Sequence, residues 1–492
     1  MKKFLLSLTS LLSLLLVSCT ETLIVDQSSP ATLATKADNS NQSVEPISFI
    51  SLVASDSWQK AESFLEKSYL CELPEGVLMD MTTESLLETC INHPLANLFY
   101  TYDDHLLFID VLVKYNNVFQ AFLSRNDATD VALQLYDRIN VIPMAKEGVW
   151  DDKGYSTSIL SQNLVELVIG SGYLTDILSE KHKSTLASIA EKWIKKKLEA
   201  PDIYSYASLE SSFLLYELAS REDTLLTQSV AKEVYSSLYD KYVQPMTKVS
   251  LLGTTTVYTL FGQPVQGLYF SELNNSEINE RIDEVYTFDP NADIVSGPTA
   301  TYNCHSYAWN ICDGGETCWI NPYDNNSGEN VSKYWTHDYY GSTTMASLAD
   351  KLVYFYGAYP AHSAIYYSSG VWESKWGDGP IVRHSLSNVP YVYNATVYYK
   401  QTVHTVSLDV PATEIVGVPI LCSPDWFVNV DHTSCVWHIT DQHENETGYT
   451  QNPSGLTNTI TFTQTGAFQI ACDVYWYSTL VGHAEEEVII TY

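Results

Sequence analysis

Residues 300–311, "ATYNCHSYAWNI", place a Cys-His pair between aromatic residues. Cys304 follows the polar stretch 299–303, and "CHSYAWNI" can form a helix with Tyr307 and Ile311 on one face. The thiol would then lie in the first turn, where the positive end of the helix dipole favours a thiolate. We therefore expect Cys304 to be a nucleophile held at a helix N-terminus.

A base for this thiol is available downstream. "YPAHSAIYYSSG" (359–370) reads as a strand that starts right after Pro360, with His362 at its beginning. After the turn at 368–370, "VWESKWG" returns as the hairpin partner and brings Glu373 and Ser374 beside His362. A helix cysteine, a strand histidine and a polar residue on the next strand follow the order of a papain-like triad.

Two other histidines compete with His362 for the role of base. His305 is adjacent to Cys304, but neighbouring residues on a helix point about 100° apart, which favours packing or substrate contact. His384, in "IVRHSLSNVPY", fits better as a hydrogen-bonded residue at a strand end. We keep His362 as the predicted base.

The motifs around Cys304 and His362 resemble those of known amidases. "NCHSYAW" is similar to the "DCSGF"-type nucleophile motif of NlpC-like cell-wall endopeptidases and to the "QC-x-x-Y-A/V" motif of CHAP amidases. "HSAIYYSSG" resembles the strand that carries the base in NlpC-like enzymes. The resemblance implies a papain-like fold with His362 as base and Ser374 as the third residue. A turn that differs by one residue would make the third residue Glu373, and CHAP-like enzymes use a carboxylate there.

The N-terminus predicts export and lipid anchoring. "MKKFLLSLTSLLSLLLVSC" has two lysines, a short leucine-rich run and small residues before Cys19, which is the plan of a signal peptide (residues 1–18). Residues 16–19 resemble the lipobox of bacterial lipoproteins, which implies lipidation of Cys19. Thr20 after that cysteine resembles the sorting pattern for the outer membrane. We therefore expect a protein of the cell envelope that a lipid anchors to the outer membrane. The sequence does not decide between its periplasmic and its outer face. Residues 19–45 read as a flexible tether, and no later run is long enough to span a membrane.

Net charge and cysteine content indicate which ligands and which crosslinks the chain can have. The chain carries 26 basic and 59 acidic residues, a net charge of −33, which repels phosphate backbones and argues against a nucleic-acid partner. Eight cysteines remain after Cys19, an even number that permits disulfides in an exported protein. Cys312 and Cys318 bracket "DGGET" and suit a small-loop bridge. No spacing typical of a zinc site is present, and we predict neither a metal nor a cofactor.

The chain divides into three folded parts, which gives a multidomain protein. Residues 46–248 show apolar residues at three- and four-residue intervals and predict a helical domain, with Thr82 as one N-cap and a break near Gly170. The lysines at 192 and 195–197 fit a solvated helix end. Residues 249–402 alternate β-branched and aromatic runs with turns around the Cys304 helix, which predicts an α+β domain. The helical part resembles, through loose motifs, the leader regions of lipoproteins of gut Bacteroidales.

Residues 403–492 predict an all-β sandwich. Cys422, Trp437 and Cys472 follow one another in the order and spacing of the strand marks of an immunoglobulin-like domain. The part is also similar to the PKD-like modules of bacterial surface proteins. On this reading Cys422 pairs with Cys472 and leaves Cys435 over; a Cys422–Cys435 bridge that closes a local loop is the alternative.

Two classes of function remain open at this point. The first is a cysteine amidase or peptidase, in which Cys304 attacks an amide of a peptidoglycan stem peptide or of a protein. The second is a non-catalytic lipoprotein that binds a glycan or a protein partner at the cell surface. The Cys-His pattern favours the first.

The lipid anchor can be tested directly. The mature chain is expected to begin at Cys19 and to partition into detergent, because acyl chains contribute about 0.8 kcal/mol per buried CH₂. The Cys19→Ala variant should appear in the soluble fraction on membrane fractionation. Equal membrane association of the variant and the parent would contradict the lipidation site.

Overall fold

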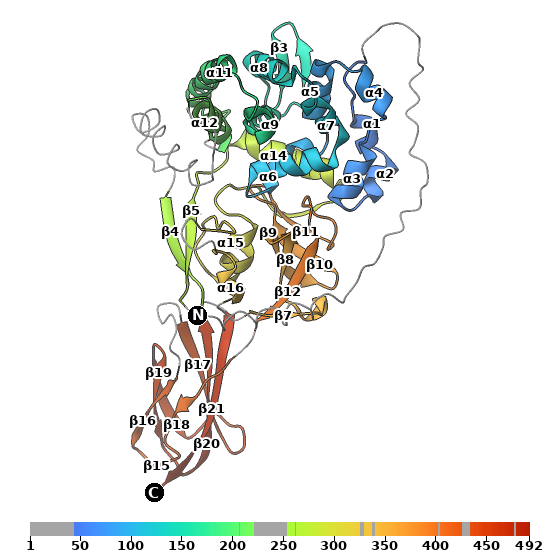
Figure 1. Ribbon diagram of the computed structural model, residues 1–492. Coiled ribbons are helices and arrows are strands. Elements are labelled where there is room, and N and C mark those ends of the chain that lie inside the picture. Colours follow the sequence, from blue (N-terminus) through green and yellow to red (C-terminus); the bar gives the residue numbers. More distant parts are fainter. Residues whose placement is uncertain are drawn as a thin grey trace, which may run out of the picture. The chain divides into compact units, whose positions relative to one another are not determined.

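The computed structural model describes residues 44–205, 207–220, 253–260, 262–324, 329–336, 340–401, 404–425, 433–476 and 479–492. The predicted signal peptide, Cys19 and the tether as far as residue 43 lie outside these residues. Contacts group residues 43–492 into one unit, which is drawn in Figure 1. The predicted boundary near residue 248 also lies outside the described residues, so the domain limits stay predictions.

The predicted helical region is helical as far as Ser220. Thr82 is the N-cap of helix α5, as predicted, because its hydroxyl accepts a hydrogen bond from Ser85 N at 3.0 Å. The predicted break is also confirmed, because one helix ends at Gly170 and the next begins at Gly172. The helices are α1 (Ile50–Val53), α2 (Asp56–Lys60), α3 (Phe64–Leu70), α4 (Glu75–Asp80), α5 (Thr83–Ile91), the 3₁₀ helix η1 (Ala96–Thr101), α6 (His105–Tyr115), α7 (Asn117–Leu123), α8 (Ala128–Arg138), α9 (Ile159–Gly170), α10 (Gly172–Thr175), α11 (Glu180–Glu199) and α12 (Ala207–Ser220).

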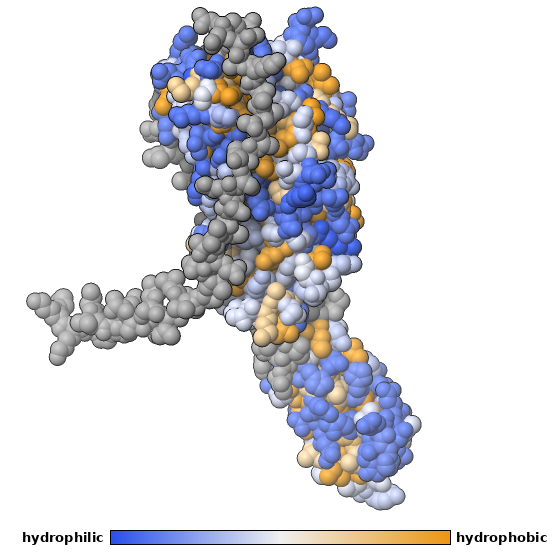
Figure 2. Space-filling model, turned by 90° about the vertical axis from the view of Figure 1, so that its right-hand side faces the viewer, coloured by the Kyte–Doolittle hydropathy of each residue, from blue (hydrophilic) through white to orange (hydrophobic). Residues whose placement is uncertain are grey.

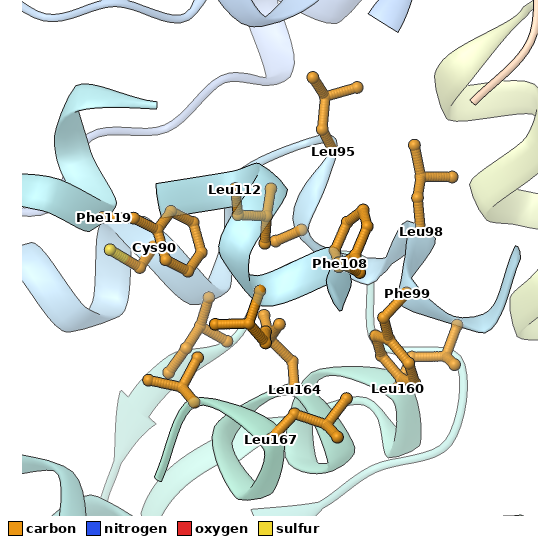
Figure 3. Packing of buried hydrophobic residues seen from close by; sticks show 14 of the residues in the cluster. Cys90, Leu95, Leu98, Phe99, Phe108, Leu112, Phe119, Leu160, Leu164 and Leu167 are labelled. Carbon is orange, nitrogen blue, oxygen red and sulfur yellow. The ribbon is translucent and has the colours of Figure 1, made fainter. Parts of the chain in front are cut away.

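Helix α9 forms the centre of this region. All of its residues from Ile159 to Gly170 are buried, including the polar residues 161–163 and Glu166. Figure 3 shows Leu160, Leu164 and Leu167 of α9 facing the apolar side chains of α5, η1, α6 and α7. The helical region therefore has a hydrophobic core built around one helix.

A small sheet interrupts the helices, which the sequence did not predict. Strands β1 (Ile139–Val141), β2 (Val149–Asp151) and β3 (Gly154–Thr157) pair in the order β1-β3-β2. The turn before β3 needs glycine, because Gly154 has φ of 120° and a Cβ there would lie 2.4 Å from the carbonyl oxygen of Arg138.

The lysine cluster of α11 is not simply a solvated helix end. Lys192 and Lys195 are exposed, but Lys197 is buried and its ammonium contacts both carboxylate oxygens of Glu166 on α9, at 3.0 and 2.9 Å. Asn163 also accepts from Lys197, at 3.2 Å. Because the charges are paired and hydrogen-bonded, this ion pair can be buried between two helices.

The second part is an antiparallel sheet of seven strands in the order β6-β11-β10-β9-β8-β12-β7, which agrees with the coarse α+β prediction. Helix α15 packs against β9. The elements of this part are β4 (Gly253–Tyr258), β5 (Pro264–Tyr269), α14 (Asn275–Phe288), β6 (Asp293–Ser296), α15 (Cys304–Trp309), the 3₁₀ helices η3 (Ile311–Asp313) and η4 (Ala346–Leu348), α16 (Lys333–Thr336), β7 (Tyr340–Thr343), β8 (Lys351–Tyr356), β9 (Tyr359–Ser368), β10 (Val371–Lys375), β11 (Ile381–His384) and β12 (Ala395–Gln401).

The helical region and this sheet share a hydrophobic core. Apolar residues of β8, β10 and β11 belong to the same buried cluster as those of the helices. Polar contacts reinforce the junction: Tyr391 donates to the carbonyl of Thr101 at 2.8 Å, and the backbone N–H of Asp378 donates to the carbonyl of Tyr100 at 3.1 Å. Within the second part, Arg281 of α14 binds Asp378 with two hydrogen bonds of 2.8 and 2.7 Å. Residues around position 100 are therefore held firmly against the sheet.

The last part consists of β strands only, arranged in two sheets. One has the order β13-β21-β20-β17 with β15 paired to β21, and the other has the order β14-β16-β19-β18. Trp437 lies opposite Cys472 in the register of β17 and β20. The strands are β13 (His404–Thr405), β14 (Leu408–Asp409), β15 (Thr413–Ile415), β16 (Pro419–Pro424), β17 (Thr433–Asp441), β18 (Tyr449–Ser454), β19 (Thr457–Phe462), β20 (Gly466–Trp476) and β21 (Thr479–Thr491).

The three cysteines of this part are free thiols. Cys422 and Cys472 are both buried, and the Cys472 thiol interacts with the thiols of Cys422 and Cys435. The Cys422–Cys472 bridge and its alternative, Cys422–Cys435, thus both stay predictions.

No single helix among the described residues has the length and apolar composition of a membrane span. Helices α6 and α7 reach that length and composition together, but they are bent by 100°. On the face shown in Figure 2, hydrophilic and hydrophobic residues are interspersed over the described surface.

His93 makes the stability of the helical region depend on pH. Burial lowers the pKa of His93 to about 3, so the folded chain keeps a neutral imidazole, which accepts a hydrogen bond from Leu95 N at 3.2 Å. The unfolded chain binds a proton near pH 6.5, so this residue's stabilisation is complete above that pH and is lost as pH falls from 6.5 to 3. The loss amounts to about 3–5 kcal/mol by the linkage relation.

We expect His93→Gln to lose less stability than the parent between pH 7 and pH 4 in urea titrations followed by tryptophan fluorescence. Asn291→Gln, a change between side chains that do not titrate at an exposed position, serves as the control and should keep the parent's slope. Equal slopes for His93→Gln and the parent would contradict this assignment.

Candidate functional site

Asn303 fixes the start of α15, and with it the position of Cys304. Its side-chain oxygen accepts hydrogen bonds from the backbone N–H groups of Ser306, at 3.0 Å, and Ile320, at 3.2 Å. Its amide group donates to the carbonyl of Ile320 at 2.7 Å and to the carboxylate of Asp103 at 2.9 Å. Cys304 is therefore the first residue of the helix, as predicted, and Asn303 is its N-cap.

The thiol of Cys304 is buried, with 1% of the residue exposed. Burial raises the pKa of Cys304 well above its usual value, and the Asp103 carboxylate raises it further. The backbone N–H groups of Ser363 and His305 and the Lys375 ammonium act in the opposite direction. In this closed arrangement the cysteine is a neutral thiol.

His305 lies beside Cys304 and is held on both sides of its ring. Nδ1 is 2.8 Å from Ser363 Oγ, and Nε2 is 3.0 Å from the carbonyl oxygen of Pro360 and 3.3 Å from Asp103 Oδ2. Burial lowers the pKa of His305 to about 3, so the ring is neutral. One donor atom each from Asp103, Cys304 and His305 lie within 4.8 Å of one another.

Lys375 places a positive charge near this cluster. Its ammonium donates to the carbonyl oxygens of Thr299, Gly377 and Gly379 at 2.8, 2.7 and 2.6 Å. Burial lowers the pKa of Lys375 to about 7, while the neighbouring Asp378 and Cys304 raise it. The lysine ties the loop after β10 to the segment before α15.

His362 differs from His305 because its ring nitrogens are unpaired. Both nitrogens are buried and neither has a hydrogen-bond partner among the described residues. The ring stacks on Tyr391 with centroids 4.0 Å apart, and the Tyr391 hydroxyl interacts electrostatically with Cys304. Burial lowers the pKa of His362 well below its usual value. Tyr391 thus stacks on one predicted catalytic residue and interacts electrostatically with the other.

The predicted third residues have other partners. Ser374 bonds to His384 Nε2 at 2.7 Å, and the other nitrogen of His384 is 2.8 Å from the carbonyl oxygen of Ser385. Glu373 accepts from Tyr307 at 2.5 Å and from Arg383 at 2.8 Å. Neither side chain hydrogen-bonds to the ring nitrogens of His362 in this arrangement, and the orienting role of Ser374 or Glu373 stays a prediction.

Cys312 and Cys318, which the sequence predicts to form a small-loop disulfide, are not bonded to each other in the structure. Cys312, in η3, is exposed and Cys318 is buried, and both are free thiols. Their disulfide stays a prediction.

Sequence reasoning missed Asp103, Lys375 and Tyr391. An asparagine directly before a helix is a frequent N-cap, so Asn303 carried a usable signal. Asp103, in "YTYDDH", lies 200 residues before Asn303 and carried none. Its contribution depends on how the helical region packs on the sheet.

Replacing Asn303 tests how firmly α15 is anchored. Asn303→Ala leaves the N–H groups of Ser306 and Ile320 and one oxygen of Asp103 without partners in a buried place. We expect the free energy of unfolding to fall by about 2–4 kcal/mol in urea titrations. Asn291→Ala, at an exposed position between α14 and β6, should change it by less than about 0.5 kcal/mol. Similar values for the two variants would show that Asn303 does not anchor the helix.

Comparison with known proteins gives one match within the chain. The model of one protein family, described as a domain of unknown function (DUF7689), matches residues 293–401. The match runs from the first residue of β6 to the last of β12, so it takes in the whole seven-stranded sheet and α15. No curated protein matches this chain. The residues of this match contain Cys304, His305 and His362, whereas Asp103 lies outside it.

Proposed function

We propose that this chain is a thiol hydrolase that cleaves amide bonds in peptides, with Cys304 as nucleophile and His362 as general base. The observation that carries the proposal is the His362 imidazole, whose two nitrogens are buried and unpaired. A buried polar group without partners is costly, and such groups are found where catalysis requires them. His362 stacks on Tyr391, whose hydroxyl interacts electrostatically with Cys304.

The position of Cys304 supports the same proposal. A thiol at the first residue of a helix is next to backbone N–H groups that favour the thiolate and can hold a developing oxyanion. The helix lies on an antiparallel sheet with the histidine on a neighbouring strand. This arrangement is compatible with the papain-like fold that the motifs imply, and the two C-terminal sheets with an immunoglobulin-like or PKD-like module.

The reaction would proceed in two stages. His362 takes the thiol proton, and the Cys304 sulfur attacks the carbonyl carbon of the peptide bond. The imidazolium then protonates the leaving amine, and a thioester remains on Cys304. Water, deprotonated by His362, hydrolyses the thioester and returns the thiol. Peptidoglycan stem peptides and proteins are the candidate substrates, reached from a lipid anchor at the cell envelope.

The proposed enzyme is closed in this structure. Cys304 and His362 have 1% and 0% of their surface exposed, so a substrate can enter only after neighbouring residues move. The helical region covers the site through Asp103, which bonds to Asn303. The burial also favours the alternative function, a non-catalytic surface-binding lipoprotein in which Cys304 is a packing residue.

Hydrolysis rates of the parent and of matched variants distinguish the thiol hydrolase from the non-catalytic binding protein. We expect the full mature chain to release amines from peptidoglycan fragments or from an unfolded protein substrate, and Cys304→Ala and His362→Gln each to reduce the rate by at least about 10³-fold. His384→Gln is the matched control, because His384 is a buried histidine on the same sheet whose two nitrogens are bonded. It should change the rate less than about tenfold.

Two results would contradict the proposal. The first is an active Cys304→Ala variant, which would place the hydrolysis elsewhere. The second is an equal loss of hydrolysis rate in His384→Gln and His362→Gln, which would show that both histidines act only through the structure of the protein. A chain without hydrolytic activity that binds a glycan or a protein would support the alternative.

A further inference from the structure

Three side chains of different chemistry meet next to the first turn of α15. Asp103 supplies a carboxylate oxygen from the connection between η1 and α6, Cys304 its sulfur and His305 a ring nitrogen, all within 4.8 Å of one another. The Asp103 side chain is 3% exposed and that of His305 is fully buried. We propose that Asp103, Cys304 and His305 form a binding site for a borderline-soft divalent cation of the Zn²⁺ type.

The distances suit such an ion. Zn²⁺ binds sulfur at about 2.3 Å and nitrogen or oxygen at about 2.0–2.2 Å, so two ligands of a tetrahedral ion lie about 3.3–3.7 Å apart. His305 Nε2 and Asp103 Oδ2 are 3.3 Å apart. The three donors thus need only a small convergence to surround one cation, with a fourth position left for water.

An unpaired oxygen points to the same ion. Oδ2 of Asp103 is buried and has no hydrogen-bond partner among the described residues, whereas Oδ1 accepts from Asn303 at 2.9 Å. A buried carboxylate oxygen without a partner is costly, and a cation between Asp103 and the Cys304 sulfur would remove that cost. Binding releases the thiol proton to solvent, because the ligand is the thiolate.

The surroundings of His305 can adapt to the cation. Ser363 Oγ accepts a hydrogen bond from Trp309 Nε1 at 2.9 Å and lies 2.8 Å from His305 Nδ1. A hydroxyl oxygen has two lone pairs, so it can also accept from Nδ1–H when Nε2 faces the metal. Such an outer partner orients a ligating histidine. Nε2 then gives up its contact with the carbonyl of Pro360, at 3.0 Å, and that oxygen can bind the water of the cation.

Charge around the site acts in both directions. Lys375 interacts electrostatically with Cys304 and opposes a cation, but its ammonium is held by three carbonyl oxygens. Two anionic ligands balance the charge of a divalent ion, and the net charge of −33 raises the local concentration of cations. The balance therefore favours binding.

The inference goes beyond the proposed hydrolase and does not require it. If Cys304 is the nucleophile, a cation on its sulfur blocks the attack, and the metal-bound chain is the inactive form. Asp103 belongs to the helical region and Cys304 to the sheet region, so the ion would also fasten the two regions together at the covered site.

Cobalt titration of the metal-free, full mature chain tests the site. We expect one equivalent of Co²⁺ to give the near-ultraviolet charge-transfer absorption of a thiolate–cobalt bond, and Zn²⁺ to remove it by competition. Cys304→Ser should lose this absorption, and Asp103→Asn and His305→Gln should each weaken binding at least tenfold. Cys312→Ser, at an exposed thiol nearby, is the matched control and should keep both the absorption and the affinity.

A wild-type measurement covers the case in which a variant fails to fold. X-ray absorption of the zinc-loaded chain should give one sulfur among nitrogen and oxygen neighbours. Zinc without a sulfur neighbour, no thiolate absorption with cobalt, or an unchanged absorption in folded Cys304→Ser would each overturn the proposal. Hydrolysis is assayed separately with chelator present, so a metal site without hydrolysis, or hydrolysis without a metal site, identifies which of the two proposals fails.

Discussion

The side chain of Asn303 joins three segments that are far apart in the sequence. It caps α15 through Ser306, holds the backbone of Ile320 by two hydrogen bonds and donates to Asp103 of the helical region. Each of these groups is buried, so each needs a partner within the protein. The position of Cys304, the loop after it and the cover over it therefore depend on one amide group.

Buried polar pairs hold the segments around the sheet in place. Arg281 and Asp378 form a two-bonded ion pair, and Lys375 is held by three carbonyl oxygens. Such groups add less stability than apolar packing, because their desolvation is costly. They do specify one arrangement, since a displaced partner leaves a buried charge unpaired. The site is closed by the same contacts that fix its geometry.

Burial also sets the chemistry of the site in this state. The pKa of Cys304 is raised and those of His305 and His362 are lowered, all chiefly by desolvation. The groups are therefore neutral while the site is closed. Hydrolysis by Cys304 and binding of a cation at the same sulfur exclude each other at any one moment, and both require the thiol to lose its proton.

The local elements follow from residue types a few positions apart, because local hydrogen bonding and side-chain periodicity specify them. Examples are the helix that begins at Cys304, the hairpin of β9 and β10 and the cap at Thr82. Three contacts could not be inferred in this way: the burial of Lys197 against Glu166, the bond from Ser374 to His384, and the approach of Asp103 to Cys304. These contacts join residues on separate elements, and packing rather than local propensity brings such residues together.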